Sequence, residues 1–440
     1  MTVGITGLRD DRPLVPAMGG ARTVPSPDPI ATDYLLLALR LDQRIPGLVD
    51  GYFGPATLKA QVDMEQLRAP GRLRQDAADL RQRLALDVPE PDRRAWLEAQ
   101  LVALEAQAAV LAGEDLSYQD LVECTMGFAP QWRDDDGLRA ARDVIDELLP
   151  GDEPLADRLA AWDRALVIPV DRIEAVCTWL VDLFRGRATR AFGLPAGDSL
   201  RVGLVTGQPW SGYCWFDGGR SSRVDINTDL PVRAPDLIRT IAHETYPGHH
   251  LEHAWKETEL VDRLGRLESS VLLINTPECT ISEGLADLGV SFAVPAEKEA
   301  DLIEETIDRA GLPVAADRGA VRAVAERAAA LRPARRALSA VSGNAAYLRH
   351  ADGLGRDAVL AYLREIGGYD AASAAKRLDF IDHPLWRTYV FVYAEGERLL
   401  RQWVEDAPPG ERTARFGRLL HEQVTPATII AGSDAGRAPG

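Results

Sequence analysis

The chain has 440 residues, of which 46% are hydrophobic, 27% charged and 6% aromatic. This balance is typical of a globular protein and excludes a collagen-like, coiled-coil or wholly disordered chain. With 50 basic and 67 acidic residues, the formal net charge is −17. A surface of this sign repels phosphate backbones, so we expect no nucleic-acid partner.

Signals for export and membrane insertion are not found in the sequence. The N-terminus has no continuous apolar segment and carries Asp10 and Asp11, which is unlike a secretory signal. No run of eighteen apolar residues predicts a membrane span. The four cysteines lie far apart and form no Cys-x-x-Cys pair, which indicates neither a disulfide framework nor a cysteine zinc cage. We expect a cytoplasmic protein.

Most of the chain has a helical pattern. Residues 1–31 are rich in Pro, Gly and Arg without periodicity and predict a flexible leader. From Asp33 onward helices are expected, most clearly from Pro91 to Gly113, where apolar residues recur at spacings of three and four. Similar patterns are found over residues 138–149, 170–192, 296–310, 320–331, 358–366 and 386–404.

One region has the pattern of strands. We expect strands over 200–206, 211–216 and 222–228, the last with strict polar and apolar alternation. Gly218 and Gly219 predict the turn before the last strand. The sequence therefore predicts a mainly α fold with a small antiparallel sheet. We divide it into a helical half, 32–195, and a half that carries the sheet, 196–432, packed as one compact unit.

Four of the seven histidines follow the third strand within eleven positions: His243, His249, His250 and His253. A helix is expected to begin near Pro235, with Asp236 in its first turn. In zinc helices of the HExxH type, two histidines at i and i+4 share a face and the intervening Glu is a general base. Here the next histidine is at i+6, which lies about 240° round a regular helix.

Pro247 offers a reason for the altered spacing. It donates no backbone hydrogen bond, and its ring clashes with the carbonyl of His243 four residues earlier. A bulge or kink that absorbs two residues would return His249 to the face of His243, and we favour His249 as the second ligand. His250 stays an alternative: it shares the face of His243 without distortion, but roughly 10.5 Å further along the axis.

Glu283 is the candidate third ligand, since catalytic zinc usually keeps three protein ligands and one open position. Thr276 and Pro277 predict the N-cap and first residue of a second helix. Glu283 and Asp287 then share one face, where the Glu can ligate the metal and the Asp can orient a ligating histidine. Gly284 is expected to let this helix approach the first one closely.

The segments HETYPGHH at 243–250 and EGLA at 283–286 resemble hallmarks of the bacterial "domain of unknown function 885" family, HExxPGHH and an EGWA-type segment. The resemblance extends from about residue 33 onward, and that family is similar to the gluzincin metallopeptidases. It implies a largely helical, zincin-like domain and a divalent metal, with zinc first and Mn, Co or Fe as alternatives. It also implies hydrolysis of a peptide or similar amide. Leu285 replaces the family's usual Trp.

Under this hypothesis Glu244 is the general base, and His250 joins Asp287 in supporting the ligands. An oxyanion must also be stabilised, and Tyr393 is our candidate, with Tyr389 and His350 as rivals. By analogy with gluzincins, the strand over 222–228 offers its edge to an extended peptide. Trp210, Tyr213 and Trp215 are expected near the cleft.

Two other functions fit the same residues. The first is a metal-dependent amide hydrolase or lyase that acts on a small metabolite. The second is a non-catalytic helical binding protein whose structural metal is closed by a fourth ligand, His250 or His253. Glu244 disfavours this last hypothesis, because a structural site needs no general base.

Overall fold

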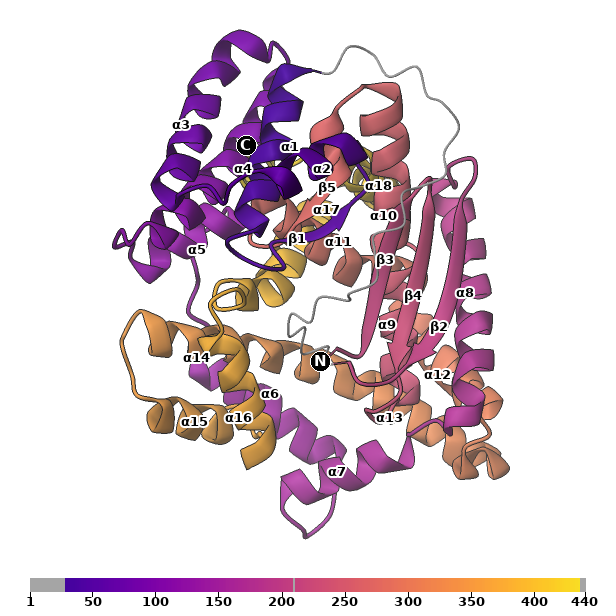
Figure 1. The fold of residues 1–440 in the computed structure, drawn as a ribbon. Coiled ribbons are helices and arrows are strands. Elements are labelled where there is room, and N and C mark those ends of the chain that lie inside the picture. The colour runs from indigo at the N-terminus through magenta and orange to yellow at the C-terminus, as the bar shows by residue number, and fades with distance from the viewer. Residues whose placement is uncertain (1–27, 209, 436–440) are drawn as a thin grey trace.

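The structure is a computed structural model that describes residues 28–208 and 210–435. It confirms the predicted mainly α fold (Figure 1). No helix within the described ranges is long and apolar enough to cross a lipid bilayer.

The first helices form a layer at one end of the molecule (Figure 1): α1 (Pro29–Asp42), α2 (Ala56–Met64), α3 (Pro70–Asp87), α4 (Pro91–Leu111) and α5 (Tyr118–Met126). Asp28 caps α1, because its carboxylate accepts a hydrogen bond from the Ile30 N–H at 2.9 Å. The leader predicted for residues 1–31 therefore extends too far at its C-terminal end, because α1 already begins at Pro29. Its part over residues 1–27 lies outside the described residues.

The remaining helices away from the candidate site are α6 (Asp135–Leu148), α7 (Leu155–Ala165), α8 (Val170–Phe192), α12 (Ala296–Ala310), α13 (Arg318–Ala337), α14 (Val341–His350), α15 (Arg356–Glu365), α16 (Ala371–Asp382), α17 (Glu397–Glu405), α18 (Arg412–His421) and α19 (Pro426–Ala435). Most of the predicted helical stretches coincide with these helices. The stretch over 386–404 is interrupted, since a 3₁₀ turn, η5 (Tyr389–Phe391), and a π-helical turn, η6 (Val392–Gly396), precede α17.

The strands form two small sheets. β1 (Val49–Tyr52) pairs antiparallel with β5 (Val271–Leu273). The second sheet has the order β2 (Ser199–Val205), β4 (Ser221–Asn227), β3 (Gly212–Gly218). β4 is antiparallel to β3 but parallel to β2. The small sheet predicted as antiparallel is therefore antiparallel between β3 and β4 and parallel between β2 and β4, because the chain passes from β2 to the far edge and the β3–β4 hairpin returns β4 into the middle.

The hairpin turn has the predicted glycines. Gly218 and Gly219 have φ of 76° and 65°, in the left-handed region that glycine adopts without steric cost. After the turn, the chain leads through β4 to α9 (Ala234–Glu244), the first of two helices that carry candidate metal ligands. β3 contacts α9.

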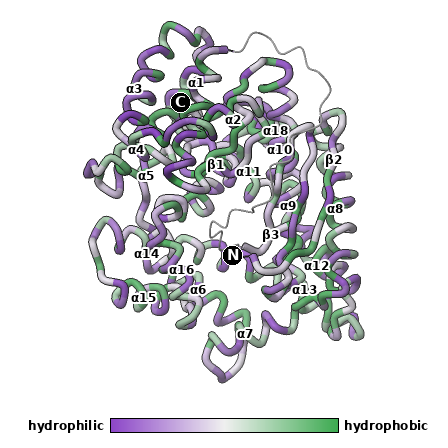
Figure 2. The backbone as a smooth tube through the Cα atoms, viewed as in Figure 1, coloured by the Kyte–Doolittle hydropathy of each residue, from purple (hydrophilic) through white to green (hydrophobic). Residues whose placement is uncertain are grey.

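The main hydrophobic core joins both predicted halves. Phe184 of α8 packs in one cluster with Ile226 of β4, Ile241 of α9 and Leu285 of α11 (Pro277–Ala293), and each is at most 1% exposed. Figure 2 shows hydrophobic and hydrophilic stretches alternating along the helices, as expected for helices with one buried face. The core therefore does not divide near residue 195, and α9 and α11 lie inside it.

Candidate metal centre

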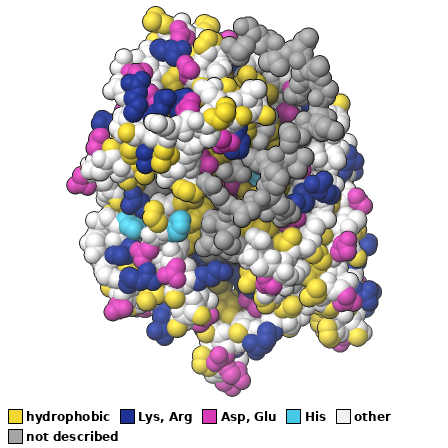
Figure 3. All heavy atoms as spheres, in the orientation of Figure 1, with side chains coloured by type: hydrophobic (Ala, Val, Ile, Leu, Met, Phe, Trp, Pro, Cys, Tyr) yellow, Lys and Arg dark blue, Asp and Glu magenta, His cyan; other side chains and the backbone are white. Residues whose placement is uncertain are grey.

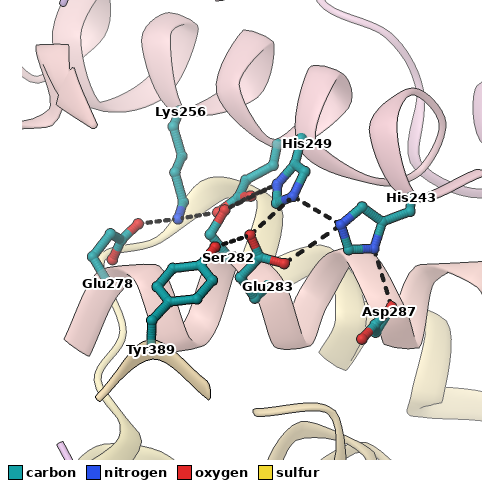
Figure 4. A network of polar contacts seen from close by, with 9 residues as sticks. His243, His249, Lys256, Glu278, Ser282, Glu283, Asp287 and Tyr389 are labelled. Carbon is teal, nitrogen blue, oxygen red and sulfur yellow. Dashed lines mark hydrogen bonds and ion pairs between the residues drawn. The ribbon is translucent and has the colours of Figure 1, made fainter. Parts of the chain in front are cut away.

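Two helical segments face each other across the site. α9 and α10 (His249–Lys256) form one wall, and α11 runs in the opposite direction as the other (Figure 4). His243, His249 and Glu283 point into the space between them, and their ligand atoms all lie within 4.8 Å of one another. The structure thus brings together the three residues that the sequence predicts as metal ligands.

The helix between the two histidines is broken rather than bulged. α9 ends at Glu244, and α10 begins at His249. Gly248 packs on the end of α9 so closely that a Cβ there would lie 1.7 Å from the His243 carbonyl oxygen. The expected two-residue kink is in fact a four-residue connection, 245–248, that places His249 opposite His243.

His250 has a different environment from the one predicted. Its Nδ1 lies 2.7 Å from Ser222 Oγ, and its Nε2 lies 3.0 Å from Asp198 Oδ1. Asp198 also accepts a hydrogen bond from the Tyr246 hydroxyl at 2.9 Å. These contacts attach the 245–248 connection to β4 and to the residues before β2. His250 therefore contacts the scaffold below the site instead of the three candidate ligands.

The ligand atoms are spaced as one small cation requires. His243 Nε2 and His249 Nε2 lie 3.1 Å apart, and Glu283 oxygens lie 3.5 and 3.6 Å from the two nitrogens. Tetrahedral ligands at zinc distances are separated by about 3.3–3.6 Å. Glu283 Oε2 is buried and accepts no hydrogen bond within the described part of the chain. Two imidazoles and a carboxylate with an unsatisfied oxygen fit a divalent metal of the zinc type.

The charges of the cluster favour a cation. Burial lowers the pKa of His243, but its contacts with Asp287 and Glu283 outweigh burial and raise the pKa to about 10. Burial likewise opposes the ionised form of Glu283, yet the two histidines hold its pKa well below the usual range. Without a metal, protons on the facing nitrogens supply the positive charge that Glu283 attracts. A bound divalent cation would replace these protons and would itself supply the positive charge beside Glu283.

Each candidate ligand is held by a further polar contact. Asp287 Oδ1 lies 3.1 Å from His243 Nδ1, as predicted for a residue that orients this histidine. His249 Nδ1 lies 3.2 Å from Ser282 Oγ, and the Ser282 hydroxyl donates to Glu252 Oε2 at 2.6 Å.

The Glu252 carboxylate is in turn paired with a buried cation. Lys256 Nζ donates to Glu252 Oε1 at 2.7 Å and also contacts Glu278 (Figure 4). Ser282, Glu252 and Lys256 are not among the site residues predicted from the sequence. A signal was present, because Glu252 and Lys256 lie at i+3 and i+7 from His249 on one helix face.

Two glycines place the C-terminal tyrosines. A Cβ on Gly284 would lie 2.6 Å from the carbonyl carbon and oxygen of Gly396. Gly284 therefore admits η6 against α11, and the expectation that it brings α11 close to α9 is wrong. As a result, Tyr389 in η5 donates a hydrogen bond to Glu283 Oε1 at 2.7 Å.

Tyr393 takes a different position from Tyr389. Its ring packs on the Tyr389 ring, with centroids 5.5 Å apart, and it lines the cavity beside the ligands. Of the three residues considered for the oxyanion, Tyr389 contacts a candidate ligand and Tyr393 faces the cavity. His350 lies elsewhere, with Nε2 2.8 Å from the Ile381 carbonyl oxygen.

Glu244 faces the same cavity as the ligands and is 6% exposed. Its carboxylate has no hydrogen-bond partner among the residues that the structure describes. Burial raises its pKa above the ordinary value, and the nearby charges of Glu283 and Asp50 act in the same direction against the two histidines. A buried, unpaired carboxylate of raised pKa is suited to accept a proton.

β3, rather than the predicted β4, is the sheet edge beside the site. β4 is paired on both sides, whereas β3 has a strand partner on one side only in the described chain. A Cβ on Gly212 would lie 2.6 Å from Thr240 Cγ2 and 3.6 Å from Glu244 Cγ, so this strand passes directly over α9.

The expected cleft aromatics divide between two environments. Trp210 and Tyr213 line the cavity with the ligands. Trp215 does not line it, and its indole N–H donates to Asp225 at 3.0 Å.

No protein-family model matches the chain, and no curated protein matches it. The fold is similar to the crystal structure described as a "putative lipoprotein" from Colwellia psychrerythraea, with a TM-score of 0.52 and 15% sequence identity. The match covers 84% of this chain and 67% of that chain. At this identity the similarity concerns the fold.

Proposed function

We propose that the chain is a zinc-dependent hydrolase that cleaves a peptide or related amide bond, as its resemblance to the "domain of unknown function 885" family and the gluzincins implies. His243, His249 and Glu283 hold the metal, and Glu244 is the general base. The observation that carries the proposal is the unpaired Glu244 carboxylate next to three converging ligand atoms. A site built only to bind metal has no need of such a carboxylate.

The chemistry divides between the metal and the chain. A bound zinc would polarise the substrate carbonyl and acidify water. Glu244 accepts the proton from the attacking water and passes it to the leaving amine. Tyr393, at the cavity wall, donates to the oxygen that becomes negative. The edge of β3 aligns an extended peptide by backbone hydrogen bonds.

Metal content and activity of matched variants test the proposal. Protein purified without a chelator is expected to carry about one zinc per chain by plasma mass spectrometry. His243→Ala and Glu283→Gln should lose it. Glu244→Gln should keep the zinc while hydrolysis of a peptide library falls about 10²- to 10⁴-fold.

The chain contains a matched control in its second His-Glu pair. Glu422 follows His421 and is paired with Arg418 on the surface. Glu422→Gln should change neither zinc content nor activity. Equal activity of wild type and Glu244→Gln would overturn the catalytic role, and zinc retained by His243→Ala would overturn the ligand assignment.

A further inference from the structure

A second cavity adjoins the candidate metal centre. His243 lines both cavities, and Asp287 and Tyr393 also line the second one. Its wall continues along α9 and α13. Because the two cavities share His243 and Tyr393, a substrate bound beside His243 can reach this space.

Arg239 reaches this second cavity from α9. It precedes His243 by four residues, so the two side chains share a helix face about 6 Å apart along the axis. In the described ranges no carboxylate lies within ion-pair distance of Arg239. A half-buried guanidinium without an acidic partner, one turn from a metal ligand, is available to a substrate.

Two arginines on α13, Arg332 and Arg336, also line the second cavity and add positive charge near Arg239. Arg332 pairs with Glu299 at 2.7 Å. Arg336 pairs with Glu397 at 3.1 Å, but Glu397 also accepts from Arg401 at 2.6 Å. Burial raises the pKa of Glu299 and the charge of Arg239 acts against this rise, but the ion pair of Glu299 is with Arg332, and Arg239 makes no ion pair of its own in the described ranges.

The pKa of Arg336 also reflects the arginines gathered around it. Burial lowers the pKa of Arg336, and the positive charges of Arg401, Arg332 and Arg239 lower it further against the attraction of Glu397. Like charges held this close are stabilised by an added anion.

Other carboxylates of the second cavity are already engaged. Asp163 pairs with Arg335 at 2.8 Å and also with Arg233. Asp287 contacts His243. Neither of these two carboxylates pairs with Arg239.

The first cavity has no arginine among the described residues that line it. Its lysine, Lys256, is already paired with Glu252 and Glu278. An arginine free to bind a carboxylate of the substrate is therefore found in the second cavity, at Arg239.

We propose that Arg239, with Arg332 and Arg336 beside it, binds a carboxylate of the substrate next to the reacting amide. The inference rests on the proposed hydrolase function and adds a substrate class to it. The planar guanidinium binds a carboxylate through two parallel hydrogen bonds. The carboxylate belongs either to the C-terminus of a peptide or to an Asp or Glu side chain flanking the cleaved bond.

Four matched peptides test the inference: benzoyl-Gly-Leu, benzoyl-Gly-Leu amide, benzoyl-Gly-Asp amide and benzoyl-Gly-Asn amide. Their kcat/KM and their Kd by calorimetry are measured on zinc-loaded wild type, Arg239→Gln and Arg322→Gln. Arg322 lies on the outer face of α13, paired with Asp301, and controls for the loss of one positive charge.

Wild type should prefer an acidic peptide over its neutral partner about 10- to 100-fold, the usual strength of a charged hydrogen-bond pair. Arg239→Gln should abolish this preference and leave the neutral peptides unchanged, while Arg322→Gln behaves as wild type. A preference only for benzoyl-Gly-Leu assigns a terminal carboxylate, and one for benzoyl-Gly-Asp amide assigns a side chain.

The binding measurement separates this inference from the proposed hydrolysis. If no peptide is cleaved but acidic peptides bind more tightly in an Arg239-dependent manner, the hydrolase proposal fails and the carboxylate site stands. Equal binding of acidic and neutral peptides, or a preference that survives in Arg239→Gln, overturns the carboxylate site whatever the activity.

Discussion

Gly248 lies against the backbone of His243, with room for no side chain between them. A Cβ at this position would lie 1.7 Å from the His243 carbonyl oxygen and 2.7 Å from that of Ala242. Its φ of −84° is accessible to any residue, so the requirement for glycine is one of space. The close contact allows His249 to begin a new helix opposite His243, which lies in the last turn of the previous one.

Gly248→Ala should therefore separate α9 from α10 and displace His249. We expect the free energy of unfolding to fall by about 3 kcal/mol or more, because the added methyl group overpacks against the backbone. We also expect the variant to lose zinc to a chelator at micromolar concentration. Denaturant unfolding and zinc content measure the two effects. Gly417→Ala in α18, where a Cβ meets nothing within 4 Å, is the control. Normal zinc retention by Gly248→Ala would contradict this account of the helix break.

The convergence of His243, His249 and Glu283 could be predicted from the sequence because its signal is local. The histidine cluster, Pro247 and the helical spacing of Glu283 and Asp287 all lie within short segments. Helices with a clear apolar period, such as α4 and α8, could be predicted for the same reason. Local periodicity reports which face of an element is buried.

The errors concern relations between distant segments. The place of β4 between β2 and β3 depends on the path of the chain, which alternation of residue types does not encode. Likewise, Gly284 contacts Gly396 and not the predicted helix, because a glycine indicates a close approach without specifying the partner. Tyr389 meets Glu283 across 106 residues, and nothing in either segment specifies that contact.

Asp287→Asn is expected to weaken zinc binding while the fold persists. Asp287 Oδ1 lies 3.1 Å from His243 Nδ1, so this contact leaves Nε2 free to bind a metal. Loss of such an orienting carboxylate typically costs 10- to 100-fold in metal affinity. Competition with a fluorescent zinc chelator gives the Kd. Asp301→Asn, on the exposed face of α12, should leave it unchanged, and equal affinities for Asp287→Asn and wild type would count against the orienting role.

Tyr389→Phe and Tyr393→Phe should have separable effects. Tyr389 donates to Glu283 Oε1 at 2.7 Å, so its loss should lower zinc affinity about 10-fold. Tyr393 lines the cavity and is the candidate oxyanion donor, so its loss should lower kcat about 100-fold or more without changing zinc affinity. Measuring zinc Kd and kcat on both variants assigns the roles. The reverse pattern would make Tyr389 the oxyanion donor.

The charged side chains near the surface should matter less than the buried network beneath the site. Figure 3 shows positive and negative side chains interspersed over one face of the molecule. Exposed pairs of this kind, such as Arg201 with Asp217 at 3.5 Å, contribute at most about 1 kcal/mol. Asp198, by contrast, is 3% exposed in its side chain and accepts from both Tyr246 and Arg185.

Asp198→Asn should therefore lower the free energy of unfolding by about 1.5–3 kcal/mol, the range for hydrogen bonds to a charged group, while Asp217→Asn changes it by less than about 0.5 kcal/mol. The effect should depend on pH. Burial raises the pKa of Asp198, but His250, Arg185 and Tyr246 outweigh burial and hold it below its usual range.

The sign of the pH dependence follows from that direction. Because the pKa is lower in the folded protein than in the unfolded chain, the ionised carboxylate stabilises the fold fully above about pH 4, and this contribution is lost as the pH falls through the folded-state value. Urea unfolding of wild type and Asp198→Asn between pH 7 and pH 3 should show the gap in stability narrowing below about pH 4. A gap that stays constant over this range would mean that Asp198 acts through packing alone.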